Sequence, residues 1–143
     1  WLNRNVTGTP VILEAADPRA DFSAHARVSS RTGLPTVIGW LGHEIQWRGY
    51  PSAGPGGRAG EVPFTARPDE VATIYSTTDI QRAKTLLAKY GVHYVYVGRL
   101  ERSKYPEAGL AKFRQFMVPV FENAAVTIYL MPEAAAIAAR ASR

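Results

Sequence analysis

The sequence predicts an α/β fold: a Rossmann-like layered mixed sheet with helices on its faces and a C-terminal antiparallel hairpin. Three observations support this prediction. Short apolar runs alternate with helix-like repeats, the run at residues 92–97 is apolar on both alternating faces, and two further β-type runs adjoin near the C-terminus. With 143 residues, of which 46% are hydrophobic, the chain at 1–143 is expected to form a single domain.

In the N-terminal half, two short strands are expected at residues 11–15 and 35–39, because each is an apolar run bounded by turn residues. The polar stretch between them, 17–31, predicts a loop with one helical turn. Residues 42–48 predict a short helix or a tight loop. Glycine and proline are dense in the segment that follows, so residues 51–65 are expected to form a flexible surface loop.

Two helices are predicted in the middle of the chain. Pro68 suits the first position of one helix, and Asp79 suits the N-cap of the other, which ends at Gly91. Apolar residues recur at helical spacing in both segments. They are Val71, Ile74 and Tyr75 in the first helix, and Ile80, Ala83, Leu86, Leu87 and Tyr90 in the second.

The last third of the chain predicts a central strand followed by the hairpin. The strand at 92–97 leads into a loop and a short helix at 109–113. Residues 117–121 and 125–130 then predict the two hairpin strands, and the proline at position 119 places the first of them at the sheet edge. The alanine-rich tail at 132–143 is expected to be a weakly anchored helix or a frayed terminus.

The composition excludes several classes of protein. Cysteine is absent, which excludes disulfides, thiolate metal sites and a cysteine nucleophile. Lys and Arg number 17 against 12 Asp and Glu, but they are spread along the chain, which predicts a diffusely basic surface. We therefore expect no nucleic-acid partner, no cofactor and no metal. No run of about 20 apolar residues and no signal-peptide pattern occurs, and the missing initial methionine predicts a fragment of a longer polypeptide.

The segment at 35–48 is the best candidate for a functional surface, because it concentrates stacking and ionic side chains in one connection. Tryptophan supplies rigid stacking area, arginine binds phosphate or carboxylate in a bidentate manner, and histidine exchanges protons near neutral pH. In the alternative interpretation, the tryptophans only cap the sheet edge and a glutamate and an arginine form an ordinary helical ion pair. The residues concerned are Trp40, His43, Glu44, Gln46, Trp47 and Arg48.

Three familiar catalytic or cofactor patterns are excluded. His43 and Glu44 match half of the zinc-protease pattern, but Trp47 stands where the second histidine ligand is required. No glycine-rich turn follows the first predicted strand, and the glycines at 54–60 follow no strand and open no helix, so neither is a phosphate-binding loop. No nucleophile elbow is present.

Charged residues outside this segment are further candidates at the same sheet edge, where ligands bind in α/β folds. Glu14 ends the first predicted strand and either points outward or faces Arg27, Arg31 or Arg48. Together with a neighbouring histidine or glutamate it would support acid–base chemistry. Residues 99–105 follow the central strand and predict either an anion site or a salt-bridged surface turn.

Several segments together resemble the C-terminal soluble region of the YYY-type membrane proteins, a family of large multi-spanning proteins of Chloroflexi and archaea. The stretch GWLGHEIQWRG at 39–49 is the most distinctive part. Leu41 stands where the family pattern has proline, and residues 51–60 resemble an insertion. Neither difference removes a charged or aromatic group. The matching segments are 32–49, 69–79, 86–102, 109–113 and 120–129.

The resemblance implies a role beside a membrane. The family is similar to the GT-C membrane glycosyltransferases, which take sugars from polyprenyl-phosphate carriers. The resemblance implies an extracytoplasmic domain, a missing part with many transmembrane helices, and a catalytic carboxylate in that missing part. The implied partners are the protein's own transmembrane region, the membrane surface, and a lipid-linked sugar or glycan acceptor.

On this resemblance, the domain is expected to be an accessory substrate- or acceptor-binding domain without turnover of its own. Tryptophan rings would stack on sugars, and Arg48 with Arg31 or Arg27 would meet a phosphate or carboxylate. Two alternatives remain open: a purely structural domain that docks onto its transmembrane region, and a nucleotide- or anion-binding module. No catalytic residue is assigned, and the expected substrate-binding residues are Glu14, Arg27, Arg31, Trp40, His43, Glu44, Gln46, Trp47 and Arg48.

Overall fold

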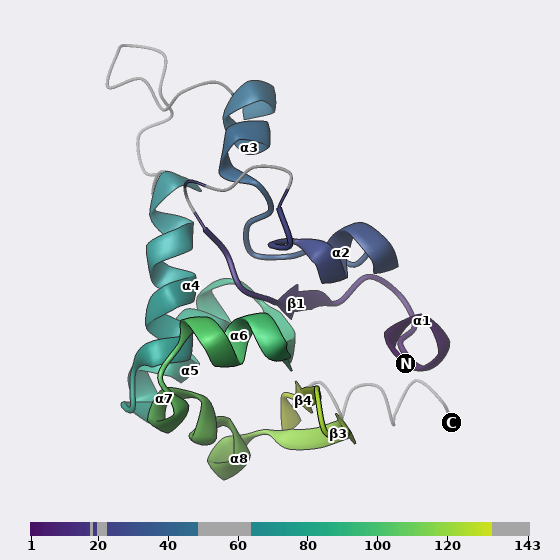
Figure 1. Cartoon of the computed structure of the whole chain (residues 1–143), viewed down its shortest axis with the longest axis vertical. Coiled ribbons are helices and arrows are strands. Elements are labelled where there is room, and N and C mark those ends of the chain that lie inside the picture. Colours follow the sequence, from purple (N-terminus) through teal and green to yellow (C-terminus); the bar gives the residue numbers. More distant parts are fainter. Residues whose placement is uncertain (18, 20–22, 49–63, 133–143) are drawn as a thin grey trace.

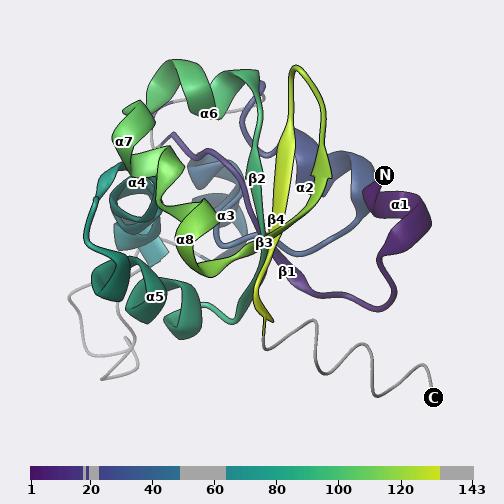
Figure 2. The ribbon, with the colours of Figure 1, turned by 90° about the horizontal axis from the view of Figure 1, so that it is seen from below.

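The computed structural model describes residues 1–17, 19, 23–48 and 64–132, except the side chain of Arg48, and these residues form a mixed α/β domain (Figures 1 and 2). Four strands make one sheet in the order β1-β2-β4-β3. β1 and β2 are parallel, whereas β2 pairs with β4, and β4 with β3, in antiparallel fashion. The strands are β1 (Val11–Leu13), β2 (Val92–Val97), β3 (Val118–Glu122) and β4 (Thr127–Leu130).

Helices cover both faces of this sheet, which confirms the predicted α/β class. α4 to α8 lie on one face, and α1 and α2 lie on the other (Figure 2). α3 extends beyond the end of the sheet (Figure 1). The helices in the described residues are α1 (Leu2–Asn5), α2 (Arg27–Thr32), α3 (Leu41–Arg48), η1 (Phe64–Ala66), α4 (Arg67–Ser76), α5 (Ile80–Lys89), α6 (Arg99–Lys104), α7 (Glu107–Ala111) and α8 (Phe113–Phe116).

The central strand β2 separates two hydrophobic clusters, as its two-sided apolar pattern predicts. Val95 and Val97 belong to the larger cluster, which α4, α5, α7 and α8 cover. Tyr94 and Tyr96 point to the other side and pack against a smaller cluster that includes Leu2 of α1. The smaller cluster is covered by two short helices, so its cover is thinner.

The predicted helices in the middle of the chain are confirmed, and so are their ends. Pro68 lies in the first turn of α4, where its missing N–H is not needed. The carboxylate of Asp79 caps α5 by accepting from the backbone N–H groups of Gln81 and Arg82 at 2.9 and 3.1 Å. Gly91 follows α5 with φ +58°, a conformation that glycine adopts without strain.

The C-terminal hairpin is also confirmed. β3 is the last strand of the sheet, so the missing N–H of Pro119 falls on an edge strand. The turn is held by the side-chain oxygen of Asn123, which accepts from the N–H groups of Ala125 and Val126 at 2.9 and 2.8 Å. Local turn chemistry and edge placement therefore agree with the sequence pattern.

The prediction of a strand at residues 35–39 is wrong. This segment makes a single parallel bridge, between Thr36 and Ile12, and the carbonyl of Pro35 accepts from the N–H of Ile12 at 2.9 Å. Its apolar residues Val37 and Ile38 are 3% and 2% exposed, so they fill the core without joining the sheet. An apolar run indicates burial, but only pairing with a neighbouring strand makes it part of a ladder.

Other boundaries differ from the prediction as well. β1 ends at Leu13 rather than at residue 15, and the carboxylate of the next residue, Glu14, accepts from backbone N–H groups in the first turn of α2. Residues 99–104 form the helix α6 instead of a loop or surface turn, and α1 was not predicted. Of the loop expected at 51–65, residues 51–63 lie outside the described residues, and so does the tail from residue 133 onward.

A buried lysine joins α4 to α7. The ammonium of Lys112, a residue only 2% exposed, donates to the carbonyl oxygens of Ile74 at 2.5 Å and Gly109 at 2.6 Å. These contacts satisfy a carbonyl at the C-terminal end of α4, where helical carbonyls lack partners. Gly109 is required beside it, because a Cβ there would lie 2.6 Å from the carbonyl oxygen of Ser76. Burial lowers the pKa of Lys112 to about 8.

Candidate functional site

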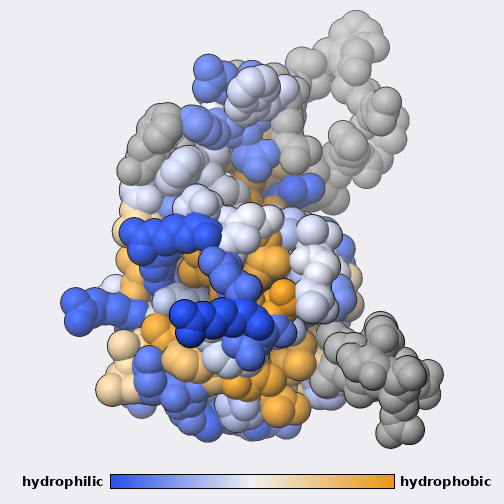
Figure 3. Space-filling model, turned by 90° about the vertical axis from the view of Figure 1, so that its right-hand side faces the viewer, coloured by the Kyte–Doolittle hydropathy of each residue, from blue (hydrophilic) through white to orange (hydrophobic). Residues whose placement is uncertain are grey.

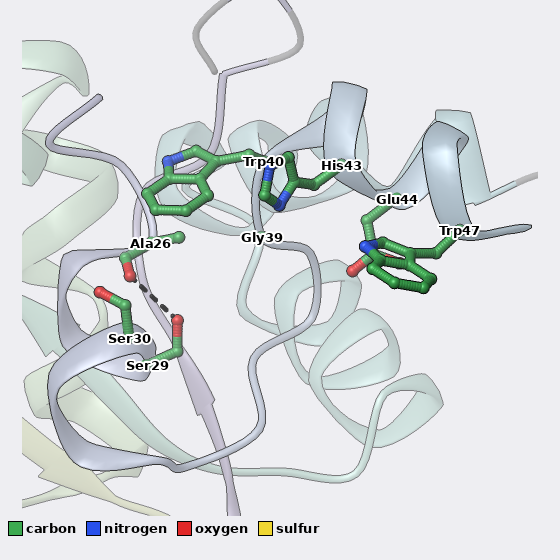
Figure 4. Close-up of a pocket in the computed structure, with 8 residues that line it drawn as sticks. All are labelled: Ala26, Ser29, Ser30, Gly39, Trp40, His43, Glu44 and Trp47. Atoms are coloured by element: carbon green, nitrogen blue, oxygen red, sulfur yellow. Dashed lines mark hydrogen bonds between the residues drawn. The ribbon is translucent and has the colours of Figure 1, made fainter. Parts of the chain in front are cut away.

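The candidate site is a pocket of about 350 Å³ between α2 and α3 (Figure 4). Its size lies at the lower end of the range of small-molecule sites, roughly 300–1,000 Å³. The residues that line it are Ala26, Ser29, Ser30, Gly39, Trp40, His43, Glu44 and Trp47.

Trp40 forms a fixed wall of the pocket. Its indole N–H donates to the backbone carbonyl of His25 at 2.8 Å, so the ring is tied to the turn that precedes α2. The His43 imidazole meets the same ring edge to face, with centroids 5.6 Å apart and planes at 87°. An aromatic side chain held by both a hydrogen bond and a ring contact gives the pocket a defined shape.

Trp47 borders the pocket from the last turn of α3, and its relative exposure is 83%. A tryptophan this exposed is unusual, because burial of its large apolar surface favours folding. Glu44 lies one turn earlier and points to the same side of the helix (Figure 4). Gln46 is exposed on α3 and does not line the pocket, and the side chain of Arg48 lies outside the described residues.

The α2 wall is positioned by Glu14. This residue is 1% exposed, and its carboxylate accepts from the backbone N–H groups of Val28 and Ser29, both at 2.8 Å. Glu14 therefore does not point outward, and it does not line the pocket. Burial raises the pKa of Glu14, against the lowering effect of the hydrogen bonds from Ser29 and Val28.

Arg27 and Arg31 also lie outside the pocket lining, although both are on α2. The guanidinium of Arg27 donates to the carboxylate of Glu101 at 2.9 Å and lies 5.2 Å from the centre of the Tyr96 ring. Arg31 is exposed on α2. The sequence-predicted residues that share one pocket are thus Trp40, His43, Glu44 and Trp47.

Glu101 is the residue that the sequence analysis missed. It is fully buried, and its carboxylate accepts from the N–H of Ala15 at 3.0 Å, the N–H of Gly98 at 2.9 Å, and Arg27. These contacts tie together the ends of the parallel strands β1 and β2 and the helix α2. A signal existed in the sequence, because a glutamate three residues after Gly98 is the capping-box spacing.

Residues 99–104 form the helix α6 rather than the predicted surface turn. In α6, Glu101 faces the core, and Lys104 donates to the carbonyl of Ala16 at 2.8 Å and to the carboxylate of Asp17 at 3.0 Å. This segment closes the carboxyl edge of the parallel pair β1 and β2 with internal contacts. The candidate pocket is lined by other segments, chiefly α2 and α3.

Fold and pocket define a mixed α/β domain with one tryptophan-bordered, hydroxyl-bearing pocket among its described residues. Comparison with protein-family models, with curated proteins and with solved structures finds no match for this chain. Within the part of the chain that the structure describes, no cluster of His, Asp and Glu is arranged to hold a metal ion. In the same part, no helix has the length and apolar character needed to cross a membrane.

Proposed function

We propose that this chain is an accessory, extracytoplasmic binding domain of a larger membrane glycosyltransferase-like protein. In this proposal the α2–α3 pocket holds a lipid-linked sugar or a glycan acceptor, and the domain has no turnover of its own. One observation carries it: Trp47 exposes 83% of its surface at the border of a pocket that also contains serine, histidine and glutamate side chains. The family resemblance supplies the membrane context.

A sugar ring suits such a pocket because it combines an apolar face of C–H groups with a rim of hydroxyl groups. An indole ring offers flat apolar area at a small cost in side-chain entropy. Serine hydroxyls, imidazole and carboxylate provide donors and acceptors for the rim. Pockets of this kind, mostly apolar with a few convergent polar groups, are typical of small-molecule sites.

Replacing Trp47 with alanine is expected to weaken sugar binding by roughly tenfold or more, because truncating an aromatic anchor of a binding site removes its contact area. The measurement is a titration of the domain with polyprenyl-phosphate sugars and neutral oligosaccharides, followed by calorimetry and by tryptophan fluorescence. Thermal unfolding should change little, since the side chain is exposed in the folded state.

Trp1 provides the matched control. It is also an exposed tryptophan, at 40%, but it packs against Phe121 with ring centroids 6.1 Å apart and does not line the pocket. Trp1→Ala should leave sugar affinity unchanged. If the wild-type domain and the full-length protein bind none of the sugars, or if both tryptophan variants bind as the wild type does, the proposed function is wrong.

A second candidate function, docking onto a transmembrane region of the same protein, is favoured by a different surface. Two exposed hydrophobic residues are Trp1, which precedes α1, and Val118 of β3, at 40% and 47%. The space-filling view from the side of α1 and α2 shows apolar surface between long hydrophilic side chains (Figure 3). If this face docks, Trp1→Ala loosens the association of the domain with the membrane part, whereas Trp47→Ala does not.

A further inference from the structure

We infer that Asn5 is an attachment site for an N-linked glycan. The chain contains three asparagines, at positions 3, 5 and 123, and only Asn5 has a serine or threonine two residues later, in Asn5-Val6-Thr7. Asn-x-Ser/Thr, with any residue except proline in the middle, is the acceptor pattern for N-glycosylation of exposed segments. The inference rests on the proposed extracytoplasmic location, because this modification takes place on that side of the membrane.

The acceptor pattern lies in an exposed connection between α1 and β1, at the outer edge of the ribbon (Figures 1 and 2). α1 ends at Asn5, and Val6 has extended backbone angles, φ −106° and ψ 127°. Asn5 and Thr7 are both exposed, whereas Val6 between them packs against the smaller hydrophobic cluster. The two side chains that a transferring enzyme must reach therefore face solvent, while the residue between them holds the segment on the domain.

The space around this connection is open. Gly8 follows the pattern with φ +72°, which glycine adopts without strain, and a Cβ built on it meets nothing within 4 Å apart from its chain neighbours. The amide nitrogen of Asn5 donates to the backbone carbonyl oxygen of Trp1 at 2.7 Å. This hydrogen bond is exposed, so water replaces it at little cost when the side chain enters an enzyme.

The transfer needs a glycan that is linked to a carrier lipid through phosphate, and an oligosaccharyltransferase in the same membrane. The side-chain nitrogen of Asn5 forms a bond to the anomeric carbon of the glycan. The bond from that carbon to the phosphate oxygen breaks, and the carrier phosphate leaves with the electron pair. One amide proton passes to a base of the enzyme, and nothing is oxidised or reduced. The chain supplies only the acceptor pattern.

A glycan on Asn5 would also distinguish the two candidate functions. The Asn5 side chain lies beside Trp1, because its amide nitrogen donates to the carbonyl of that residue. An attached glycan would cover the exposed surface around Trp1, which the docking candidate requires for contact with a transmembrane region. Glycosylation of Asn5 and docking through this face therefore exclude each other, whereas the α2–α3 pocket is lined by other residues.

The test is mass spectrometry of the full-length protein, purified from the cells that naturally make it. Trypsin cleaves after arginine, so residues 5–19 lie in one peptide, between the arginines at positions 4 and 19. The expected result is a glycan on this peptide, with fragment ions that place it on Asn5. In variants made in the same cells, Thr7→Ala should abolish the modification. Thr7→Ser should retain it, because serine keeps the hydroxyl that the pattern requires.

Asn3→Gln is the matched control, because Asn3 is an exposed asparagine of the same helix without a serine or threonine two residues later. It should leave the glycan on Asn5 unchanged. Protease digestion of intact cells shows on which side of the membrane the domain lies. If the domain is extracytoplasmic and Asn5 carries no glycan, or if Thr7→Ala keeps the glycan, the inference is overturned while the proposed function stands. If the domain faces the cytoplasm, both fail together.

Discussion

Replacing Glu101 with alanine is expected to lower the free energy of unfolding by about 3–5 kcal/mol, the cost of breaking a buried ion pair from one side. The substitution removes the acceptor for the N–H groups of Ala15 and Gly98 and leaves Arg27 without its partner. All of these groups lie where β1, β2 and α2 meet. Urea unfolding followed by circular dichroism measures the loss.

Glu101→Gln distinguishes the contribution of the negative charge to stability from that of the hydrogen bonds. The glutamine amide oxygen still accepts from one backbone N–H. The glutamine variant should therefore be more stable than the alanine variant, by about 1–2 kcal/mol. Both variants should also weaken sugar binding, because Arg27 belongs to the helix that carries Ser29 and Ser30. A stability loss below about 1 kcal/mol for the alanine variant would show that these contacts do not hold the strand ends together.

Lys112→Met is the second substitution with a large expected effect, a loss of about 1–3 kcal/mol at pH 7. Methionine fills a similar volume but cannot donate to the carbonyls of Ile74 and Gly109, which would remain buried without a partner. The backbone there cannot move closer, because Gly109 already contacts the end of α4. Thermal and urea unfolding of the two proteins test this expectation.

The same pair of proteins gives a pH dependence. Burial lowers the pKa of Lys112 from 10.5 to about 8, so between these values the unfolded chain binds more protons than the folded one. Stability from this group therefore rises with pH, by up to about 1.4 kcal/mol per unit. The stability difference between wild type and Lys112→Met should widen from pH 8 to pH 10. A constant or shrinking difference would contradict the lowered pKa.

Comparing the two proteins isolates the lysine from other groups that titrate in this range. Tyr105 is buried, and its pKa is raised to about 12, mainly by burial. Above pH 10 the unfolded state therefore loses tyrosine protons that the folded state keeps, and this destabilises both proteins equally. The difference between the two unfolding free energies removes that contribution.

The sequence predicts the pocket only in part. The cluster of Trp40, His43, Glu44 and Trp47 could be found from composition, since these residue types concentrate in one short segment, and all but Trp40 lie on α3. The opposite wall could not be found in this way. Ser29 and Ser30 are ordinary surface residues until Glu14, from another part of the chain, fixes the helix that carries them.

The segment at 35–39 shows the same limit of prediction from sequence, here for the fold. Its apolar residues predict burial correctly, but the backbone beyond Thr36 finds no neighbouring strand to pair with. By contrast, α4, α5 and the hairpin were predicted with nearly correct ends, because their caps and turns act within a few residues.

The sequence by itself determined the α/β class, the central strand, the capped helices and the segment with exposed tryptophan. Each depends on local periodicity or on contacts within one turn. Only the tertiary structure decided where the charges lie: Glu14 and Glu101 are buried at strand ends, Arg27 is paired, and Lys112 joins two helices. Their partners are distant in the sequence or are backbone groups, and a buried charge is tolerated only where the fold brings such partners to it.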